Sequence, residues 1–244
     1  DICAEAASSG HLEILRWARS QGCPWNGTCT GAAKAGNLGI LQWARANGCP
    51  WEGTCTFAAK AGNLGILQWA RANGCPWYSD TCFLAAAYGH LEVLQWARTN
   101  GADWDERTAN FAAARGHLEV LQWARAQGCP SVGNSICQTA AAAGQLAVLQ
   151  WARCYGLNWD SEVCSEASAA GHLEVLKWAH GNGCPWDEET CARAAWTGRL
   201  DILRWARAHG CPWDKRTCAQ AAKGAHLKVL RWAWIYDCPW DEDT

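Results

Sequence analysis

Among its 244 residues the sequence has no methionine, and it has only three phenylalanines and four tyrosines. It also lacks an excess of basic charge, because 21 Lys and Arg face 23 Asp and Glu, which leaves a formal charge of -2. Proteins that bind nucleic acid usually carry a basic surface that neutralises phosphates. We therefore do not expect nucleic acid to be the partner.

Long hydrophobic runs are absent as well. A membrane-spanning helix needs roughly 20 consecutive apolar residues, whereas the repeated Leu-Gln-Trp-Ala-Arg segments interrupt every apolar stretch with charge. We expect a soluble protein without a membrane segment. Because the chain has no initiator methionine and begins and ends partway through a repeat, we also expect it to be part of a longer protein, so its lack of a targeting signal is uninformative.

The usual signatures of catalysis are missing too. No nucleophile stands in a pattern with a base and an orienting group, and no phosphate-binding glycine loop is found apart from the turns of the repeat itself. The sequence therefore predicts a protein that is not an enzyme, with no cofactor and no small-molecule substrate.

What the sequence does contain is a repeat of about 27 residues. Its most regular mark is a tryptophan that recurs at steps of 26, 26, 27, 27, 28, 27, 27 and 27, at Trp17, Trp43, Trp69, Trp96, Trp123, Trp151, Trp178, Trp205 and Trp232. A fixed period of this size is typical of solenoids and related repeat architectures.

Each unit, represented by residues 184–210, predicts two short helices. In the first helix Cys191, Ala194 and Ala195 fall on one face, and Gly198 is expected to end it, because glycine adopts the left-handed conformation without penalty. The second helix follows at once and carries a broad apolar stripe around Leu203. Glycine and a Cys-Pro-Trp turn then lead into the next unit.

The start of the first helix has two candidate caps. Asp187 or Thr190 can each accept a hydrogen bond from a free backbone N–H there. At the start of the second helix, histidines alternate with Asn, Gln and Arg, which suits a hydrogen-bonding cap better than a metal ligand. The positions are His11, Asn37, Asn63, His90, His117, Gln145, His172, Arg199 and His226.

Neither helix is long enough to be stable alone, since isolated helices below roughly 12 to 15 residues are marginal in water. Each unit must therefore bury its apolar stripe against its neighbours. The sequence predicts an all-α fold, a solenoid of stacked helix-turn-helix repeats with no significant β-sheet. We expect a single domain over residues 1–244, with about eight full helix pairs and partial repeats at the ends.

Two segments carry a resemblance to a known family. The sequence of ankyrin repeats is resembled by two segments: residues 116–121, Gly-His-Leu-Glu-Val-Leu, and residues 101–105, Gly-Ala-Asp-Trp-Asp. The resemblance extends over the whole chain, repeat by repeat, but the units are shorter than the 33 residues of ankyrin repeats. The missing residues correspond to the β-hairpin finger, which is expected to be absent. The resemblance implies a helical stack whose concave groove binds proteins without catalysis.

Sixteen cysteines invite a metal or redox hypothesis. Eight lie in first helices, seven lie in turns, and Cys154 stands apart. The spacing of Cys184 and Cys191 does not match structural zinc sites, and no histidine recurs beside them. Ala102 and Leu157 replace the turn cysteine and Ala109 replaces the helix cysteine, so the position accepts other apolar groups. We expect reduced core residues without metal, in a reducing cytoplasmic compartment.

The 19 tryptophans are also explained better by packing than by a ligand site. Seventeen of them occupy two fixed positions of the repeat, and a fixed position indicates packing more than ligand binding. Burial of each ring removes about 150 to 250 Å² from water, which compensates for the small residues of the first helices.

Positions that vary while their neighbours stay fixed are the ones expected to meet a partner. They are the two residues after the helix cysteine and the two before the helix-ending glycine. Large aromatic and arginine side chains are typical anchors of an interface. The candidate partner-binding residues are Phe57, Phe83, Tyr88, Phe111, Arg115, Arg193 and Trp196. For Phe57 and Phe111 a role in thickening the core remains an equal alternative.

Two irregularities interrupt the pattern. Residues 129–137 replace the turn tryptophan by Ser131 and hold an extra residue, which predicts a weak joint. In the last repeat the helix-ending glycine has shifted to Gly224, and Ala225 takes its usual place.

These observations favour a protein-interaction scaffold or adaptor. A structural or spacer subunit of a larger assembly is the main alternative, and a protein that uses its cysteines for metal or redox chemistry is a weaker one.

Overall fold

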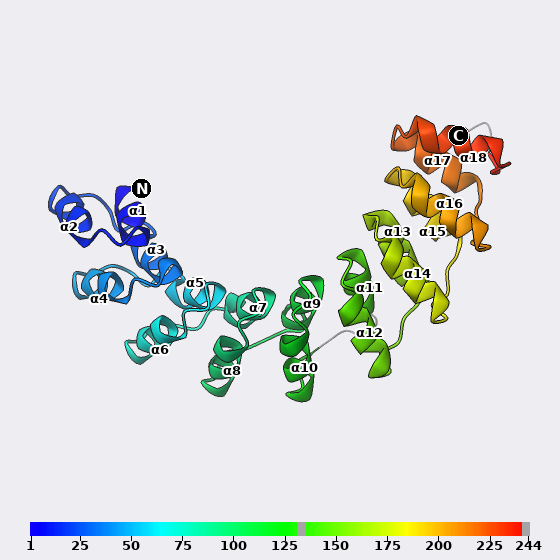
Figure 1. The fold of residues 1–244 in the computed structure, drawn as a ribbon. Coiled ribbons are helices and arrows are strands. Elements are labelled where there is room, and N and C mark those ends of the chain that lie inside the picture. Colours follow the sequence, from blue (N-terminus) through cyan, green and yellow to red (C-terminus); the bar gives the residue numbers. More distant parts are fainter. Residues whose placement is uncertain (131–134, 241–244) are drawn as a thin grey trace. The chain divides into compact units, whose positions relative to one another are not determined.

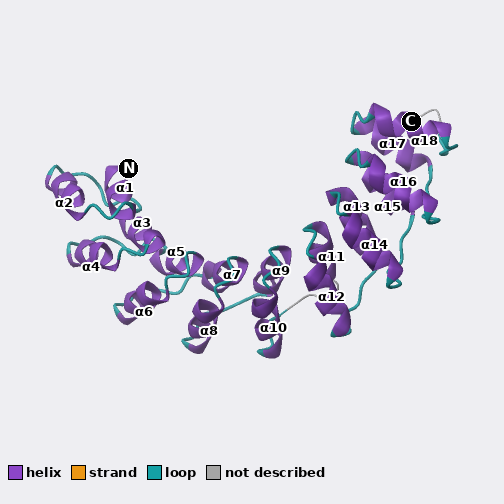
Figure 2. Cartoon of the chain, in the orientation of Figure 1, coloured by secondary structure: helices purple, strands orange, loops and turns teal. Residues whose placement is uncertain are grey.

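The computed structural model describes residues 1–130 and 135–240. Over these ranges it contains helices and turns and no strand (Figures 1 and 2). The first helices of the repeats are α1 (Ile2–Ser8), α3 (Thr28–Ala35), α5 (Thr54–Lys60), α7 (Asp80–Ala87), α9 (Glu106–Ala114), α11 (Ser135–Ala142), α13 (Ser161–Ala170), α15 (Glu188–Trp196) and α17 (Lys215–Lys223). The prediction of an all-α repeat solenoid is confirmed.

Each first helix is followed by a second helix of the same repeat. These are α2 (Leu12–Ser20), α4 (Leu38–Ala46), α6 (Leu64–Ala72), α8 (Leu91–Thr99), α10 (Leu118–Ala126), α12 (Leu146–Cys154), α14 (Leu173–Gly181), α16 (Leu200–Ala208) and α18 (Leu227–Ile235). None of the described helices is long and apolar enough to cross a membrane.

The chain forms two compact units. Unit 1 comprises residues 1–112 and 119–130, and unit 2 comprises residues 113–118 and 131–244. The prediction of a single domain over 1–244 depends on how these units are joined and stays a prediction. Residues 131–134 of the predicted weak joint lie outside the described residues, so the joint also stays a prediction.

Within each unit the first helices pack directly on one another, because the residues that face each other are small. In unit 1 this row runs α1, α3, α5, α7, and in unit 2 it runs α11, α13, α15, α17 (Figure 1). At Gly31 the approach is so close that an added Cβ would lie 2.8 Å from the carbonyl oxygen of Ala4. A larger side chain there would push α3 away from α1.

The core lies between the first and second helices. One leucine of each second helix up to α16 is buried there, at Leu15, Leu41, Leu67, Leu94, Leu121, Leu149, Leu176 and Leu203. Each such leucine contributes about 1.5 to 3 kcal/mol by leaving water, and its neighbours in the core are the buried alanines and cysteines of the first helices. This explains why short helices hold together only as a stack.

The ends of the first helices are formed largely as the sequence predicts. Asp187 caps α15 by accepting a hydrogen bond from the backbone N of Glu189 at 3.1 Å, and Asp160 and Asp214 cap their helices in the same way. The alternative cap, Thr190, is wrong, because this residue is buried inside the helix. Gly198 has the expected left-handed conformation, with φ of 73°.

The prediction that His, Asn, Gln and Arg cap the second helices needs correction. These residues stand at the N-cap position, but none of the described caps makes a side-chain hydrogen bond to its own helix. Several bind the preceding repeat instead. Asn63 Nδ2 donates to the carbonyl oxygen of Ala33 at 2.8 Å, and His90 Nε2 lies 3.1 Å from that of Lys60. The free carbonyls at the end of one first helix are thus satisfied by the next repeat.

The tryptophans pack as predicted, but most of them are only half-buried. In seven repeats the turn tryptophan meets the helix tryptophan of the same repeat with ring centroids 5.7 to 5.9 Å apart. An arginine from the preceding second helix covers the turn ring; Arg45 lies 4.0 Å from the centroid of Trp51. Trp151, whose repeat has Ser131 in place of the turn tryptophan, packs on Tyr155 at 5.3 Å.

Candidate functional site

The solvent-exposed side of the first helices is called the first-helix face here. Its most exposed large side chains among the candidates are Phe111, 43% exposed, and Trp196, 49% exposed. Phe57, Phe83 and Tyr88 are half-buried. An exposed aromatic ring loses contact with water only when a partner covers it, so these positions suit a binding surface better than a core.

Unit 1 brings two of the predicted aromatic residues together. The rings of Phe83 on α7 and Phe111 on α9 have centroids 4.8 Å apart. The guanidinium of Arg107 lies over Phe83 at 5.0 Å and is held there by Asp80 and Asp105, at 3.0 Å and 2.9 Å. We call Phe83, Phe111 and Arg107 the aromatic cluster.

A second contact in unit 1 lies at the glycine end of the first helices. The ammonium of Lys60 on α5 lies 5.1 Å from the ring centroid of Tyr88, which follows α7. Such a contact between a cation and a ring contributes roughly 0.5 to 1 kcal/mol at an exposed site. This contact also fixes the orientation of the Tyr88 side chain. Phe57, on α5, is half-buried.

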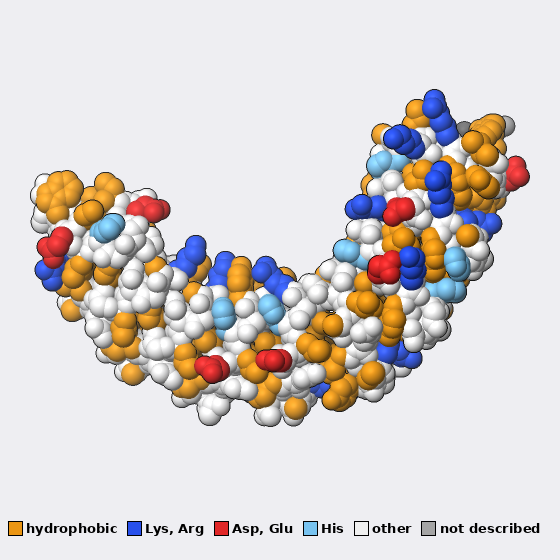
Figure 3. All heavy atoms as spheres, in the orientation of Figure 1, with side chains coloured by type: hydrophobic (Ala, Val, Ile, Leu, Met, Phe, Trp, Pro, Cys, Tyr) orange, Lys and Arg blue, Asp and Glu red, His pale blue; other side chains and the backbone are white. Residues whose placement is uncertain are grey.

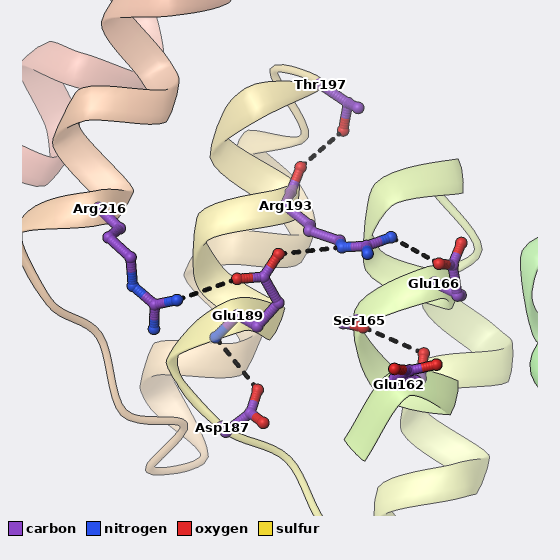
Figure 4. A network of polar contacts seen from close by, with 8 residues as sticks. All are labelled: Glu162, Ser165, Glu166, Asp187, Glu189, Arg193, Thr197 and Arg216. Atoms are coloured by element: carbon purple, nitrogen blue, oxygen red, sulfur yellow. Dashed lines mark hydrogen bonds and ion pairs between the residues drawn. The ribbon is translucent and has the colours of Figure 1, made fainter. Parts of the chain in front are cut away.

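Unit 2 contains a network of ion pairs that the sequence did not reveal (Figure 4). Arg193 on α15 bridges Glu166 on α13 and Glu189 on its own helix, at 2.5 Å and 3.1 Å. Glu189 in turn binds Arg216 on α17 at 3.2 Å, and Arg216 binds Asp214 at 2.8 Å. Burial alone would lower the pKa of Arg193, but the two glutamates outweigh it and raise the pKa. The guanidinium of Arg193 therefore stays charged and links α13 to α15, and the pair of Glu189 with Arg216 extends the network to α17.

Beside this network lies an open cavity of about 580 Å³. It is lined by Ala169, Ala192, Trp196, Gln220 and Lys223. Arg193, Glu189 and Thr197 complete the lining. The structure thus places two predicted residues, Arg193 and Trp196, at one site. Arg115, the remaining candidate, is exposed and lies near the boundary of the units.

The cysteines are arranged differently from the pairing that their spacing suggests. The thiol of Cys191 contacts that of Cys211, which lies 20 residues later, and not that of Cys184. The turn thiols also donate to the carbonyl of a capping aspartate, as Cys184 does to Asp160 at 3.3 Å. Among the described residues no group of three or more His, Cys, Asp or Glu is placed to hold a metal ion.

Burial lowers the reactivity of several of the first-helix thiols, whereas the neighbouring thiols of Cys29 and Cys55 lower the pKa of Cys49 and of Cys75. Burial raises the pKa of Cys82 to about 12, and the pKa of Cys129 and of Cys137 to about 11 each. Burial beside a second thiol raises the pKa of Cys191 further. Because the thiolate is the reactive and metal-binding form, this arrangement favours cysteines that act as core residues.

Sequence reasoning could have found the arginine positions of the second helices, because Arg19, Arg45, Arg71, Arg98, Arg153 and Arg207 all stand six residues before a turn tryptophan. It could not have found Glu166 with Arg193, since these residues are 27 positions apart and similar pairs do not recur in every repeat. The cavity also depends on packing of three helices.

Comparison with known proteins agrees with the helical repeat fold. Residues 82–125 match the model of a family described as ankyrin repeats (many copies). A solved structure, the ankyrin repeat domain of human ASB11, is 17% identical to the chain, with a TM-score of 0.54 over 65% of this chain and 85% of that one. No curated protein sequence matches. The fold is therefore that of an ankyrin-like repeat protein.

Proposed function

From this ankyrin-like repeat fold we propose that the protein is an interaction scaffold or adaptor, which binds a partner protein through the first-helix face. Ankyrin repeats are generally protein-interaction modules. The observation that carries the proposal is the exposure of large aromatic side chains at the variable positions of this face, with Phe111 and Trp196 as the main examples.

The energetics support this role. A few aromatic and arginine side chains usually supply most of the affinity of a protein interface. The aromatic cluster offers such an anchor in unit 1, because Asp80 and Asp105 hold Arg107 in place before any partner arrives. In unit 2 the ion pairs of Arg193 similarly fix one wall of the cavity. Side chains that are already ordered lose less entropy on binding.

The same reasoning leads us to propose that the partner is not a nucleic acid, a membrane or a small-molecule substrate, and that the protein is not an enzyme. The charge of -2 gives no general attraction to phosphates. We further propose a reducing, cytoplasmic location, because fourteen of the sixteen cysteines are buried as free core thiols.

Affinity capture from cells with matched variants tests the proposal. We expect F83A/F111A to lose a protein that the unchanged chain retains, and W17A to keep it, because Trp17 is equally aromatic and 62% exposed but lies on a second helix. In unit 2, W196A is compared with Y155A, whose side chain is also exposed.

The result that would overturn the proposal is retention of the captured protein by F83A/F111A and W196A, together with its loss from W17A or Y155A. Chemical crosslinks to many proteins on all sides of the described helices would instead favour the spacer subunit.

A further inference from the structure

The charges of the first-helix face are divided between the two ends of the helices. The two positions before each helix-ending glycine, or before Ala225 in the last repeat, hold no Asp or Glu in any of the repeats. Their charged members are Lys34, Lys60, Arg115 and Lys223. Acidic side chains stand instead at the starts of α7, α9, α13 and α15, where the positive end of the helix dipole stabilises them, whereas the first turns of α3 and α5 hold none. The glycine end is therefore a basic edge.

In unit 1 this edge carries positive charge that forms no ion pair with the residues that the structure describes. Lys34 is exposed and Lys60 is half-buried, and neither ammonium has an ion-pair partner among the described residues. Arg107 differs, because Asp80 and Asp105 balance its charge. Figure 3 shows Lys and Arg side chains along the edge of the first helices of unit 1, with hydrophobic side chains between them.

The basic edge borders the aromatic residues. Lys60 lies against Tyr88, and Tyr88 follows the same helix, α7, that carries Phe83 of the aromatic cluster. A ligand on this face would therefore meet ammonium groups along one side and aromatic rings along the other.

We propose that unit 1 binds an acidic polypeptide segment that also carries apolar side chains, an inference that rests on the partner-binding function proposed above. Carboxylates of the segment pair with Lys34 and Lys60, and its apolar side chains cover the rings of Phe83 and Phe111. The lysine pairs set orientation and association rate, whereas the aromatic rings supply affinity once the segment covers them.

A peptide suits this surface better than a phosphate backbone does. The starts of the neighbouring helices α7 and α9 carry Asp80, Asp105 and Glu106, three acidic side chains against the single Arg107, which would disfavour a second line of phosphates. A narrow acidic segment can stay on the basic edge and still reach the aromatic cluster. A single strand of nucleic acid is therefore one of the comparison probes.

Fluorescence anisotropy with labelled peptides tests the proposal on the full chain. One short peptide contains glutamate and leucine, a second has lysine in place of glutamate, and a third has serine in place of leucine. We expect the first to bind tightest, and more weakly at high salt. K34E/K60E and F83A/F111A should each weaken it by about ten-fold or more.

The matched control is K177E/K228E, which changes the net charge equally but lies on second helices α14 and α18. It should bind as the unchanged chain does, and circular dichroism should show all variants folded. Equal binding of the lysine peptide, no binding of the acidic peptide, or equal weakening by K177E/K228E would overturn the inference. Tighter binding of a labelled oligonucleotide with the same lysine dependence would do so as well.

The two proposals fail separately. If a captured cellular protein is lost from F83A/F111A but retained at full level by K34E/K60E, then the first-helix face binds a partner. In that case the inference that the ligand is an acidic segment is wrong. If F83A/F111A, K34E/K60E and W196A all retain the captured protein, then the partner-binding function itself is wrong.

Discussion

Single cysteines in this chain differ sharply in their surroundings. Fourteen of the sixteen are buried, Cys23 is half-buried and Cys154 is exposed at the end of α12. Burial raises the pKa of Cys82 to about 12 and that of Cys137 to about 11, so these thiols stay protonated at pH values where an exposed thiol ionises.

Thiol labelling of the native protein near neutral pH should therefore show one fast phase, from Cys154, and C154S should remove it. All sixteen thiols should react after denaturation without reductant, because we expect no disulfides. Several fast native thiols, or fewer than sixteen after denaturation, would contradict core packing of reduced cysteines.

Asn63 illustrates a residue whose position the sequence predicted and whose partner it did not. Its side chain reaches Ala33 of the preceding repeat at 2.8 Å. N63A should lower the free energy of unfolding by about 1 kcal/mol, since it leaves a carbonyl at the helix end without a partner. The control is N73A, because Asn73 bonds only to Trp69 of its own helix and is exposed. If N63A and N73A lower the free energy of unfolding equally in urea denaturation, then Asn63 does not act as a link between repeats.

For single residues, the repeat period predicts the position in a helix or turn but not the contacts that the side chain makes there. Gly198 was predictable because backbone geometry at a helix end is local. The bond from Asn63 to Ala33 and the ion pair of Arg193 with Glu166 join different repeats, so they depend on how the helices are stacked.

At the scale of helices, the end of α17 is strained in a way that explains the glycine shift. Ala225 has φ of 57°, in the left-handed region where other repeats have glycine, whereas Gly224 has φ of -76°. Gly224 is needed for another reason, since an added Cβ would lie 2.4 Å from the carbonyl oxygen of Trp196 on α15. The close approach of α15 and α17 therefore requires glycine at position 224, one residue before its usual place in the repeat.

Replacing this alanine tests the explanation. A225G should stabilise the protein by about 1 kcal/mol, because glycine has no Cβ penalty in the left-handed region. G224A should destabilise it, because α15 and α17 would have to move apart. Both are measured by thermal and urea denaturation. A destabilising A225G, or a neutral G224A, would show that the strain and the close approach are not as described.

Helices were also the part of the fold that the sequence predicted best. Gly-terminated apolar stripes set the length of most helices, as residues 200–208 show, whereas Ala225 and Asp237 take the place of the glycine in the last repeat. The predicted capping by His and Asn was wrong, because the side chains do not accept from their own helix: Asn63 donates to a carbonyl oxygen of the preceding repeat, and His90 Nε2 contacts another.

At the scale of the whole molecule, the repeats form two compact units. The sequence predicts a weak joint at residues 129–137, where Ser131 replaces the turn tryptophan that elsewhere packs on the helix tryptophan of its repeat. Hydrogen exchange should be fastest in this segment, because local stability follows buried contacts. Uniform protection of all turns would refute the joint. S131W, which restores the usual turn residue, should slow exchange there.

The binding site could be predicted only in part at this scale. Variable positions drew attention to Phe83, Phe111, Arg193 and Trp196, and the structure joins them into an aromatic cluster and a cavity. The sequence did not show that Lys34 and Lys60 lack an ion-pair partner among the described residues. This depends on which acidic side chains the fold brings close to the two ammonium groups.

The central claim is that a partner protein covers the first-helix face. Hydrogen exchange of the chain with and without a captured partner tests it most directly. We expect the partner to slow exchange in α5, α7 and α9, or in α13, α15 and α17, and to leave second helices such as α6 and α14 unchanged. Protection confined to the second helices, with first helices exchanging as in the free chain, would contradict the claim.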